Sequence, residues 1–199
     1  MSGPWDIVKT ELLALHARTP ALRDFCTLPD PLPDQTFTPW LSRAAPLVQA
    51  NPGETTPELT ALRDALVDAT PHAQWRETYK GSSIGDDFVS KFGVYQLIGP
   101  SEAPFHSETL RSFIAWTPPG MYYTWHHHPA EELYVVLAGE AEFSVHGQDT
   151  RTLRPGNSVY HDSMQPHALT NRDHPVLSYV LWRGDLTTPP AVTPPEMLT

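Results

Sequence analysis

The chain has 199 residues and a formal net charge of −10, because 23 Asp and Glu outnumber 13 Lys and Arg. An acidic surface of this kind argues against nucleic acid and anionic membranes as partners, since both require a basic face. Hydrophobic residues make up 40% of the chain, enough for the core of one compact domain. The single cysteine, Cys26, excludes an intramolecular disulfide, and we expect its thiol to be buried and inert.

The N-terminal part of the chain has the pattern of a helical segment. Apolar residues recur at helical spacing from Ile7 onward, and Thr19–Pro20 ends this stretch. Thr56-Pro57-Glu58 is a typical helix start before the amphipathic run LTALRDALVDA. We expect residues 1–80 to form helices that pack on the remainder of the chain. The predicted helices begin near Ile7, Ala21, Trp40 and Thr56.

After about residue 84 the pattern changes to short β-rich runs broken by Gly, Pro and Asp. About nine strands at this spacing predict a mainly β fold, a sandwich or barrel, and not a βαβ fold. We place this barrel at residues 81–190 and a proline-rich tail, expected to run over the surface, at 191–199. The predicted strands are FVSKFGVYQLIG, LRSFIAWTP, MYYTWHHH, ELYVVLAG, EAEFSVHG, DTRTLRPG, SVYH, HALTN and VLSYVLWRG.

The N-terminus, MSGPWDIVKTELLALHART, lacks the basic and apolar regions of a signal peptide. No apolar run approaches the ~20 residues that a transmembrane helix needs. We therefore expect a cytoplasmic protein with no membrane partner. Its oligomeric state is left open between monomer and homodimer.

The stretch GMYYTWHHHPAEELYVVLAG, residues 120–139, concentrates metal-ligand residue types. Residues two apart on a strand point to one face, so His126 and His128 can aim at a common point. A turn follows, and Glu132 leads back on the next strand. Two imidazoles and a carboxylate suit Zn, Fe, Mn, Co or Ni. By the same alternation, His127 turns away from this point.

A further ligand is expected from RPGNSVYHDSMQPH, residues 154–167. His167 directly follows a proline and is the favoured candidate, and His161 is its competitor. The remaining histidines lack neighbours of this kind, and we expect them to face solvent or to bond in loops. They are His16, His72, His106, His146 and His174.

The spacing G-x5-H-x-H-x3-E-x6-G, followed by P-G and P-H, resembles the two motifs of the cupin superfamily. The first motif matches at every defined position; the second has Asn157 where Asp is commonest. The motifs cover about 50 residues, and the flanking strands extend the likeness to roughly 85–185. The resemblance implies a double-stranded β-helix, or jelly-roll barrel, with the N-terminal helices added to it. The fold alone fixes no reaction.

The tyrosines around the histidines discriminate between cupin functions. Tyr134 stands two residues after Glu132, so its phenol should lie at or near the metal. A phenol has a pKa near ~10, and a neighbouring divalent cation lowers it by favouring the phenolate. A tyrosine polarised by a metal is therefore a candidate general base at neutral pH. Strand alternation would place Tyr122, not Tyr123, on the face of His126.

The helical N-terminal segment and GMYYTWHHHPAEELY closely resemble the cupin-type dimethylsulfoniopropionate (DMSP) lyases, particularly the Q type. That resemblance implies one divalent transition metal, Zn, Fe or Mn, held by His128, Glu132, Tyr134 and His167. His126 then stands just off the metal, whereas spacing alone would make it the fourth ligand; the two alternatives remain open. The family's catalytic tyrosine matches Tyr123, which requires a bulge between Tyr123 and His126.

The resemblance implies cleavage of a zwitterionic sulfonium substrate, DMSP, to dimethyl sulfide and acrylate. The substrate carboxylate would bind the metal or a neighbouring donor, and Tyr123 or Tyr134 would remove the adjacent proton. A cationic sulfonium favours an aromatic wall. Trp182 is the first candidate for that wall, followed by Trp125 and Trp116.

Two other functions fit the cupin motifs. An iron dioxygenase acting on a small organic acid would consume oxygen, which elimination does not need. A non-catalytic cupin that binds a metabolite has no need for a phenol beside a metal, so the tyrosines count against it.

Overall fold

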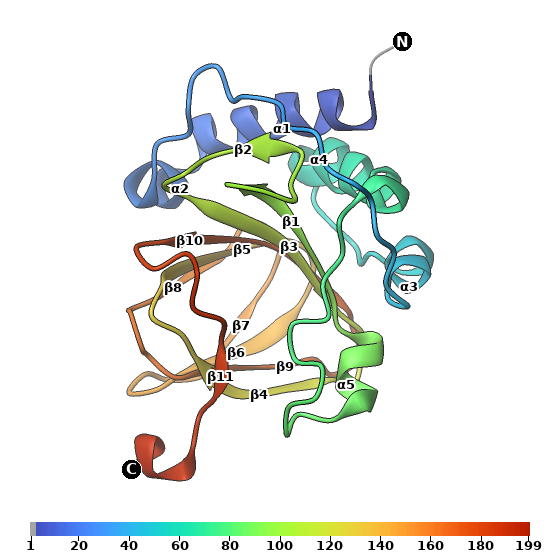
Figure 1. Cartoon of the computed structure of the whole chain (residues 1–199). Coiled ribbons are helices and arrows are strands. Elements are labelled where there is room, and N and C mark those ends of the chain that lie inside the picture. Colours follow the sequence, from blue (N-terminus) through green and yellow to red (C-terminus); the bar gives the residue numbers. More distant parts are fainter. Residues whose placement is uncertain (1–2) are drawn as a thin grey trace.

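Two β-sheets face one another, and helices cover the outer face of one of them (Figure 1). This arrangement comes from a computed structural model that describes residues 3–199. The first sheet has the strand order β2-β1-β3-β10-β5-β8, and the second has the order β11-β4-β9-β6-β7. The helices are α1 (Pro4–Arg18), α2 (Pro20–Phe25), α3 (Ala45–Ala50), α4 (Pro57–Asp68), η1 (Thr70–His72), α5 (Asp86–Lys91) and η2 (Pro195–Leu198).

The strands of the first sheet are β1 (Gly93–Gly99), β2 (Phe105–His106), β3 (Arg111–Thr117), β5 (Glu131–Gly139), β8 (Ser158–His161) and β10 (Val176–Arg183). The strands of the second sheet are β4 (Tyr122–His127), β6 (Ala141–Val145), β7 (Arg151–Leu153), β9 (His167–Thr170) and β11 (Ala191–Val192). Together they form the predicted barrel.

The first sheet is buried on both faces, because its side chains alternate between two apolar clusters. On β3, Ile114 and Trp116 belong to the cluster shared with helices α1 and α4, whereas Phe113 and Ala115 belong to the cluster between the sheets. Residues of alternate parity on a strand point to opposite faces. The N-terminal helices therefore cover the outer face of the same sheet whose inner face lines the barrel.

The predicted helices are largely confirmed, with two corrections. The helix expected from Trp40 begins only at Ala45, because Pro46 occupies the first turn; Trp40 instead forms a β-bridge with Gln74. The run that begins at Phe88 was expected to be strand throughout. Its first four residues instead finish α5, a helix with acidic residues in its first turn and Lys91 in its last.

All nine predicted β runs contain a strand, and the structure adds two short ones. β2 pairs with β1, and β11 pairs with β4 from within the proline-rich tail. The division of the chain at residues 80 and 190 stays a prediction. Across residues 3–199, every helix is too short or too polar to cross a membrane.

His16 was expected to face solvent or to bond in a loop, and this expectation is wrong. It lies in α1, is buried against the first sheet, and its Nε2 is 3.1 Å from the hydroxyl of Tyr179. Burial lowers the pKa of His16 to about 4. Cys26 is only half buried, and burial raises the pKa of its thiol to about 11.

The burial of His16 should make the fold sensitive to acid. Its pKa is near 6.5 in the unfolded chain and about 4 in the folded one, so the unfolded state binds the proton first. The stabilisation is present above pH 6.5 and is lost as the pH falls through 4, by up to about 3 kcal/mol. Urea unfolding of the His16→Gln variant across this window should show a correspondingly shallower pH dependence.

The matched control for this experiment is His72→Gln, which alters an exposed histidine. It should retain the pH profile of the wild-type protein. Parallel profiles for the His16→Gln variant and the wild type would contradict the assignment.

Candidate metal centre

One row of side chains runs across four neighbouring strands of the first sheet. His161 on β8 pairs with Glu132 on β5, Glu132 pairs with Trp182 on β10, and Trp182 pairs with Arg111 on β3. Opposed residues in adjacent strands project to the same face of a sheet. Glu132, Trp182 and Arg111 all line a cavity of about 120 Å³ between the two sheets, which suits a small molecule.

Glu132 is the centre of the polar contacts in this row. The carboxylate accepts a 2.6 Å hydrogen bond from Nε1 of Trp182 and a 2.7 Å bond from Nδ1 of His161. Nε2 of His128 and Nε2 of His167 lie 3.3 and 3.1 Å from its oxygens. The carboxylate is almost completely buried, and the hydrogen bonds from Trp182 and His161 offset part of its desolvation cost.

His128 and His167 are held with their Nε2 atoms directed into the cluster. Nδ1 of His128 donates to the carbonyl of Ala130 at 3.0 Å, and Nδ1 of His167 donates to the carbonyl of Gln165 at 2.9 Å. Those bonds fix the tautomer, so each Nε2 carries a lone pair. Both Nε2 atoms are buried and have no hydrogen-bond partner among residues 3–199.

These features fit a divalent metal ion. The side chains of His128, Glu132 and His167 each offer one ligand atom, and these atoms lie within 4.8 Å of one another. Two imidazoles and one carboxylate form a ligand set typical of transition metals. Backbone carbonyls that orient metal-binding histidines through Nδ1 are a common feature of such sites.

The electrostatics of the cluster keep Glu132 ionised. Burial by itself raises the pKa of this carboxyl, but the neighbouring imidazoles of His128 and His167 and the hydrogen bond from His161 hold it well below its usual range. Burial, with a contribution from His167, lowers the pKa of His161 to about 4. His161 is therefore a neutral donor to Glu132 at neutral pH, and its own Nε2 lies outside the three-residue group.

Tyr123 and His126 lie side by side at the edge of this cluster. Their rings are stacked, with centroids 3.9 Å apart and an interplanar angle of 9°. A register shift in the β4–β9 pairing between Tyr123 and His126 places two residues of β4, Thr124 and Trp125, opposite one of β9, Ala168. The expected bulge is thereby confirmed, and it brings both residues to the cavity face. Tyr122 is 52% exposed.

The Tyr123 hydroxyl is bonded to a second phenol, that of Tyr79, at 2.5 Å. Sequence reasoning missed Tyr79, because it lies in a loop 44 residues earlier and carries no motif. Burial raises the pKa of Tyr123 well above its usual value, and neighbouring Tyr79, Tyr134 and Glu132 add to this effect. Burial, followed by the charge of Glu132, also raises the pKa of Tyr134.

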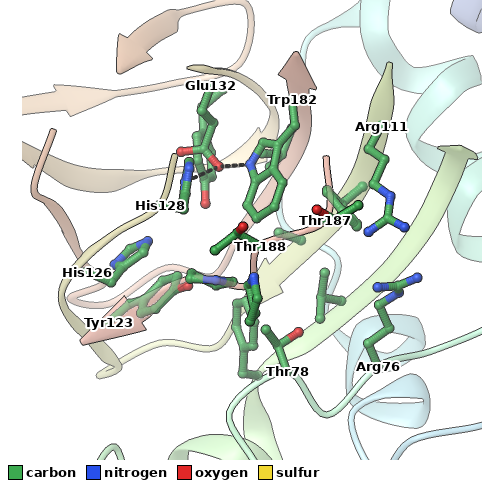
Figure 2. Close-up of a pocket in the computed structure, with 18 residues that line it drawn as sticks. Arg76, Thr78, Arg111, Tyr123, His126, His128, Glu132, Trp182, Thr187 and Thr188 are labelled. Atoms are coloured by element: carbon green, nitrogen blue, oxygen red, sulfur yellow. Dashed lines mark hydrogen bonds and ion pairs between the residues drawn. The ribbon is translucent and has the colours of Figure 1, made fainter. Parts of the chain in front are cut away.

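The remaining predicted residues divide between the cavity and its surroundings. Tyr134 and Trp182 both line the cavity. Figure 2 shows Trp182 beside His128 and Glu132, and the centroid of its ring lies 4.3 Å from that of His128. Trp116 is on the opposite face of the sheet, where its Nε1 donates to Asn51. Trp125 is half buried and does not line the cavity. Neither Trp116 nor Trp125 therefore forms the aromatic wall expected for a sulfonium group.

His127 turns away from the cavity, as strand alternation predicts. Its Nδ1 is 2.9 Å from the hydroxyl of Thr193, next to β11. The structure also adds residues that carried no sequence signal. Arg76, Arg111 and Thr187 line the side of the cavity away from His126 (Figure 2), and Thr78 and Thr188 line it nearer its middle.

Comparison with known proteins agrees with this geometry. The sequence matches the dimethylsulfoniopropionate lyase family over residues 30–178. It is 48% identical over 186 residues to the dimethylsulfoniopropionate lyase DddQ of Ruegeria pomeroyi, a match that covers 94% of this chain and 92% of that protein.

The structure superposes on the crystal structure of DddQ from Ruegeria pomeroyi with a TM-score of 0.92 at 46% identity, covering 98% of this chain and 99% of that one. It also superposes on a chain from the crystal structures of the DMSP lyases RdDddP and RnDddQII, with a TM-score of 0.91 at 33% identity, covering 96% and 98%. The fold and the buried histidine–glutamate cluster define a cupin. The chain belongs to the dimethylsulfoniopropionate lyase family.

The cluster predicts which histidine is needed for metal binding. The His167→Ala variant should lose most of its bound metal, because it removes one of three convergent ligand atoms. The metal content per chain, measured by plasma mass spectrometry after purification, tests this outcome. Full metal content in this variant would contradict the assignment and would implicate His161 instead.

His127→Ala is the matched control, since it removes a neighbouring histidine that faces away from the cavity. It should retain the metal content of the wild-type protein.

Proposed function

We propose that this chain cleaves dimethylsulfoniopropionate to dimethyl sulfide and acrylate by proton abstraction and β-elimination. The observation that carries the proposal is the buried phenol of Tyr123, which faces a small cavity beside a cluster able to bind a metal. Membership in the family supports the choice of substrate. On this proposal, the enzyme is a carbon–sulfur lyase.

We propose that His128, Glu132, Tyr134 and His167 hold one Zn, Fe or Mn ion. His128, Glu132 and His167 form the group of convergent ligand atoms, and Tyr134 lines the same cavity. His126 is the alternative fourth ligand. The centroid of its ring lies 4.1 Å from that of the His167 ring. When bound, a divalent cation supplies Lewis acidity and a positive charge that favours phenolate over phenol.

Tyr123 is proposed as the general base. Its phenolate takes the proton from the carbon next to the substrate carboxylate, and the C–H electron pair becomes the carbon–carbon double bond of acrylate. The bond from the β-carbon to sulfur breaks, and its electrons leave with neutral dimethyl sulfide. The proton remains on the Tyr123 hydroxyl until solvent removes it. Tyr134 is the alternative base, since it lines the same cavity.

Two neighbours support Tyr123 in this role. The stacked ring of His126 holds the phenol at a fixed orientation, and the Nδ1 of His126 is itself fixed on the carbonyl of Thr124 at 2.8 Å. The hydroxyl of Tyr79 lies 2.5 Å from that of Tyr123, and either can donate. The bond raises the pKa of Tyr123 when Tyr123 donates; it would stabilise the phenolate only with Tyr79 as the donor. Placement of the base by packed neighbours is the usual requirement for efficient proton transfer.

Trp182 is proposed as the aromatic wall for the sulfonium group. It lines the cavity at the centre of the row between Glu132 and Arg111, and its ring packs edge-on against Phe113 at 5.3 Å between centroids. A ring face attracts a cation by ~0.5–2 kcal/mol. The same residue donates Nε1–H to Glu132, so it also orients a proposed metal ligand.

The Tyr123→Phe variant tests the general base. Purified, metal-analysed protein is incubated with dimethylsulfoniopropionate, and dimethyl sulfide in the head space and acrylate in solution are measured. The variant should retain its metal but lose about 10²–10⁴-fold in turnover, the usual contribution of a general base. Near-normal turnover would exclude Tyr123 as the base and leave Tyr134.

The matched control is Tyr122→Phe, which removes the adjacent but exposed phenol. It should turn over as the wild-type protein does.

Comparison of Trp182→Phe with Trp182→Leu separates the two roles of Trp182. Both variants lose the bond to Glu132, so both should bind the metal more weakly. Only the leucine variant lacks an aromatic face, and its KM should exceed that of the phenylalanine variant by about 2- to 30-fold. Equal KM values, measured at saturating metal, would remove the cation–π role.

A further inference from the structure

His161 is the histidine of the buried cluster to which the proposed function gives no role. It lies on β8, is only 1% exposed and does not line the cavity, so it is shielded from both solvent and substrate. Its Nε2 is buried and has no hydrogen-bond partner within residues 3–199. A buried imidazole with one unpaired nitrogen is costly. The benefit of a histidine at this position must therefore come from its other contacts.

The Nδ1 atom of His161 makes a polar contact with the centre of the cluster. It lies 2.7 Å from Oε2 of Glu132. A carboxylate that binds a metal carries no proton and can only accept hydrogen bonds. Nδ1 is therefore the donor, and Nε2 carries the lone pair. A bond from N–H to a charged carboxylate is stronger than one between neutral groups.

Two features of the fold aim this donor at Glu132. The pairing of β5 with β8 places His161 directly opposite Glu132, so that both side chains project to the same face of the first sheet. The ring of His161 is also stacked on that of His167, with centroids 3.9 Å apart and an interplanar angle of 14°. His161 thus contacts one candidate ligand from each sheet.

The two oxygens of Glu132 are held from the two strands that flank β5. Oε1 accepts a hydrogen bond from Trp182 on β10, marked by a dashed line in Figure 2, and Oε2 accepts one from His161 on β8. Each oxygen also lies beside an unpaired Nε2, that of His128 at 3.3 Å from Oε1 and that of His167 at 3.1 Å from Oε2. The carboxylate cannot rotate away from the imidazoles without breaking one of its two hydrogen bonds.

We propose that His161 is a positioning residue of the metal centre, whose Nδ1–H holds Glu132 in the orientation that binds a divalent transition metal. It raises the affinity of the site without binding the ion and without contacting the substrate. Hydrogen-bonded partners of ligating carboxylates typically contribute about 10- to 100-fold to metal affinity. The inference rests on the metal centre of the proposed function, but not on the reaction proposed there.

The test compares two substitutions that are similar in shape but differ in the donor. The amide nitrogen of asparagine stands the same number of bonds from Cα as Nδ1 of histidine, whereas leucine has a methyl group there. The zinc-loaded protein is titrated with a chromophoric chelator that competes for the ion. The dissociation constant for Zn²⁺ should rise about 10- to 100-fold in the His161→Leu variant and stay within about threefold of the wild type in the His161→Asn variant.

Rescue by asparagine separates positioning from packing and from direct ligation. Both variants lose the ring that stacks on His167, so a packing role alone predicts equal affinities. A ligand role of His161 through Nε2 predicts that both variants lose the metal, because neither has an imidazole. Equal Zn²⁺ affinities in the two variants, at the wild-type value or below it, overturn the proposal.

A third variant keeps the test decisive if the His161→Leu variant does not fold. His161→Phe retains a planar ring against His167 but lacks the donor, and it should bind Zn²⁺ about 10- to 100-fold more weakly than the wild type. Wild-type affinity in this variant would also overturn the proposal. The matched control is His174→Leu, which removes an exposed imidazole and should leave the affinity unchanged.

Turnover of the metal-loaded wild type distinguishes this inference from the proposed function. The wild type could release no dimethyl sulfide from dimethylsulfoniopropionate, while the leucine and asparagine variants differ in Zn²⁺ affinity as expected. That result refutes the proposed reaction and supports the positioning role. Release of dimethyl sulfide by the wild type, together with equal Zn²⁺ affinities in the two variants, refutes the positioning role and supports the reaction.

Discussion

A buried carboxylate, that of Glu132, is the constraint on which the site depends. A carboxylate out of contact with water costs several kcal/mol unless charged or hydrogen-bonding groups surround it. Glu132 accepts hydrogen bonds from Trp182 on β10 and from His161 on β8. His128, in the loop after β4, and His167, on β9, place their Nε2 atoms beside its oxygens, where a metal ion would be held. Its position ties four strands, β5, β8, β9 and β10, and the loop after β4 to one point.

The N-terminal helices contribute to this site without touching it. They cover the outer face of the first sheet, so that each of its strands is packed on both sides. On β10, Leu181 packs toward the helices while Val180 and Trp182 face the cavity. A strand packed on both faces cannot slip by one residue without exposing apolar side chains. The register that aligns Glu132, Trp182 and Arg111 is thereby specified by the core on the far side of the sheet.

The sequence predicted the parts of the site that follow from local periodicity. His128 and Glu132 are close in the chain, and the alternation of strand residues was enough to set His127 aside. The bulge between Tyr123 and His126 followed only from the family resemblance, because strict alternation favours Tyr122. Trp116 shows the limit of residue type as a signal: its strand has two buried faces, and hydrophobicity does not tell which one it occupies.

Residues distant in sequence could not have been predicted in the same way. Tyr79 reaches Tyr123 from a loop outside the strands, and Arg76 reaches the cavity from the loop that precedes α5. His16 is buried by contact with Tyr179, a partner 163 residues away. The tail strand β11 has only two paired residues, too short for a period-two pattern to be recognised. Tertiary contacts decide all of these placements.

The charge distribution along the cavity differs from that of the whole molecule. A net charge of −10 repels an anion at long range and gives a zwitterion little net attraction. Inside the cavity, Arg76 and Arg111 create a local positive field on the side away from His126, where low-dielectric walls strengthen it. The interior end offers the ring of Trp182 and the phenols of Tyr123 and Tyr134.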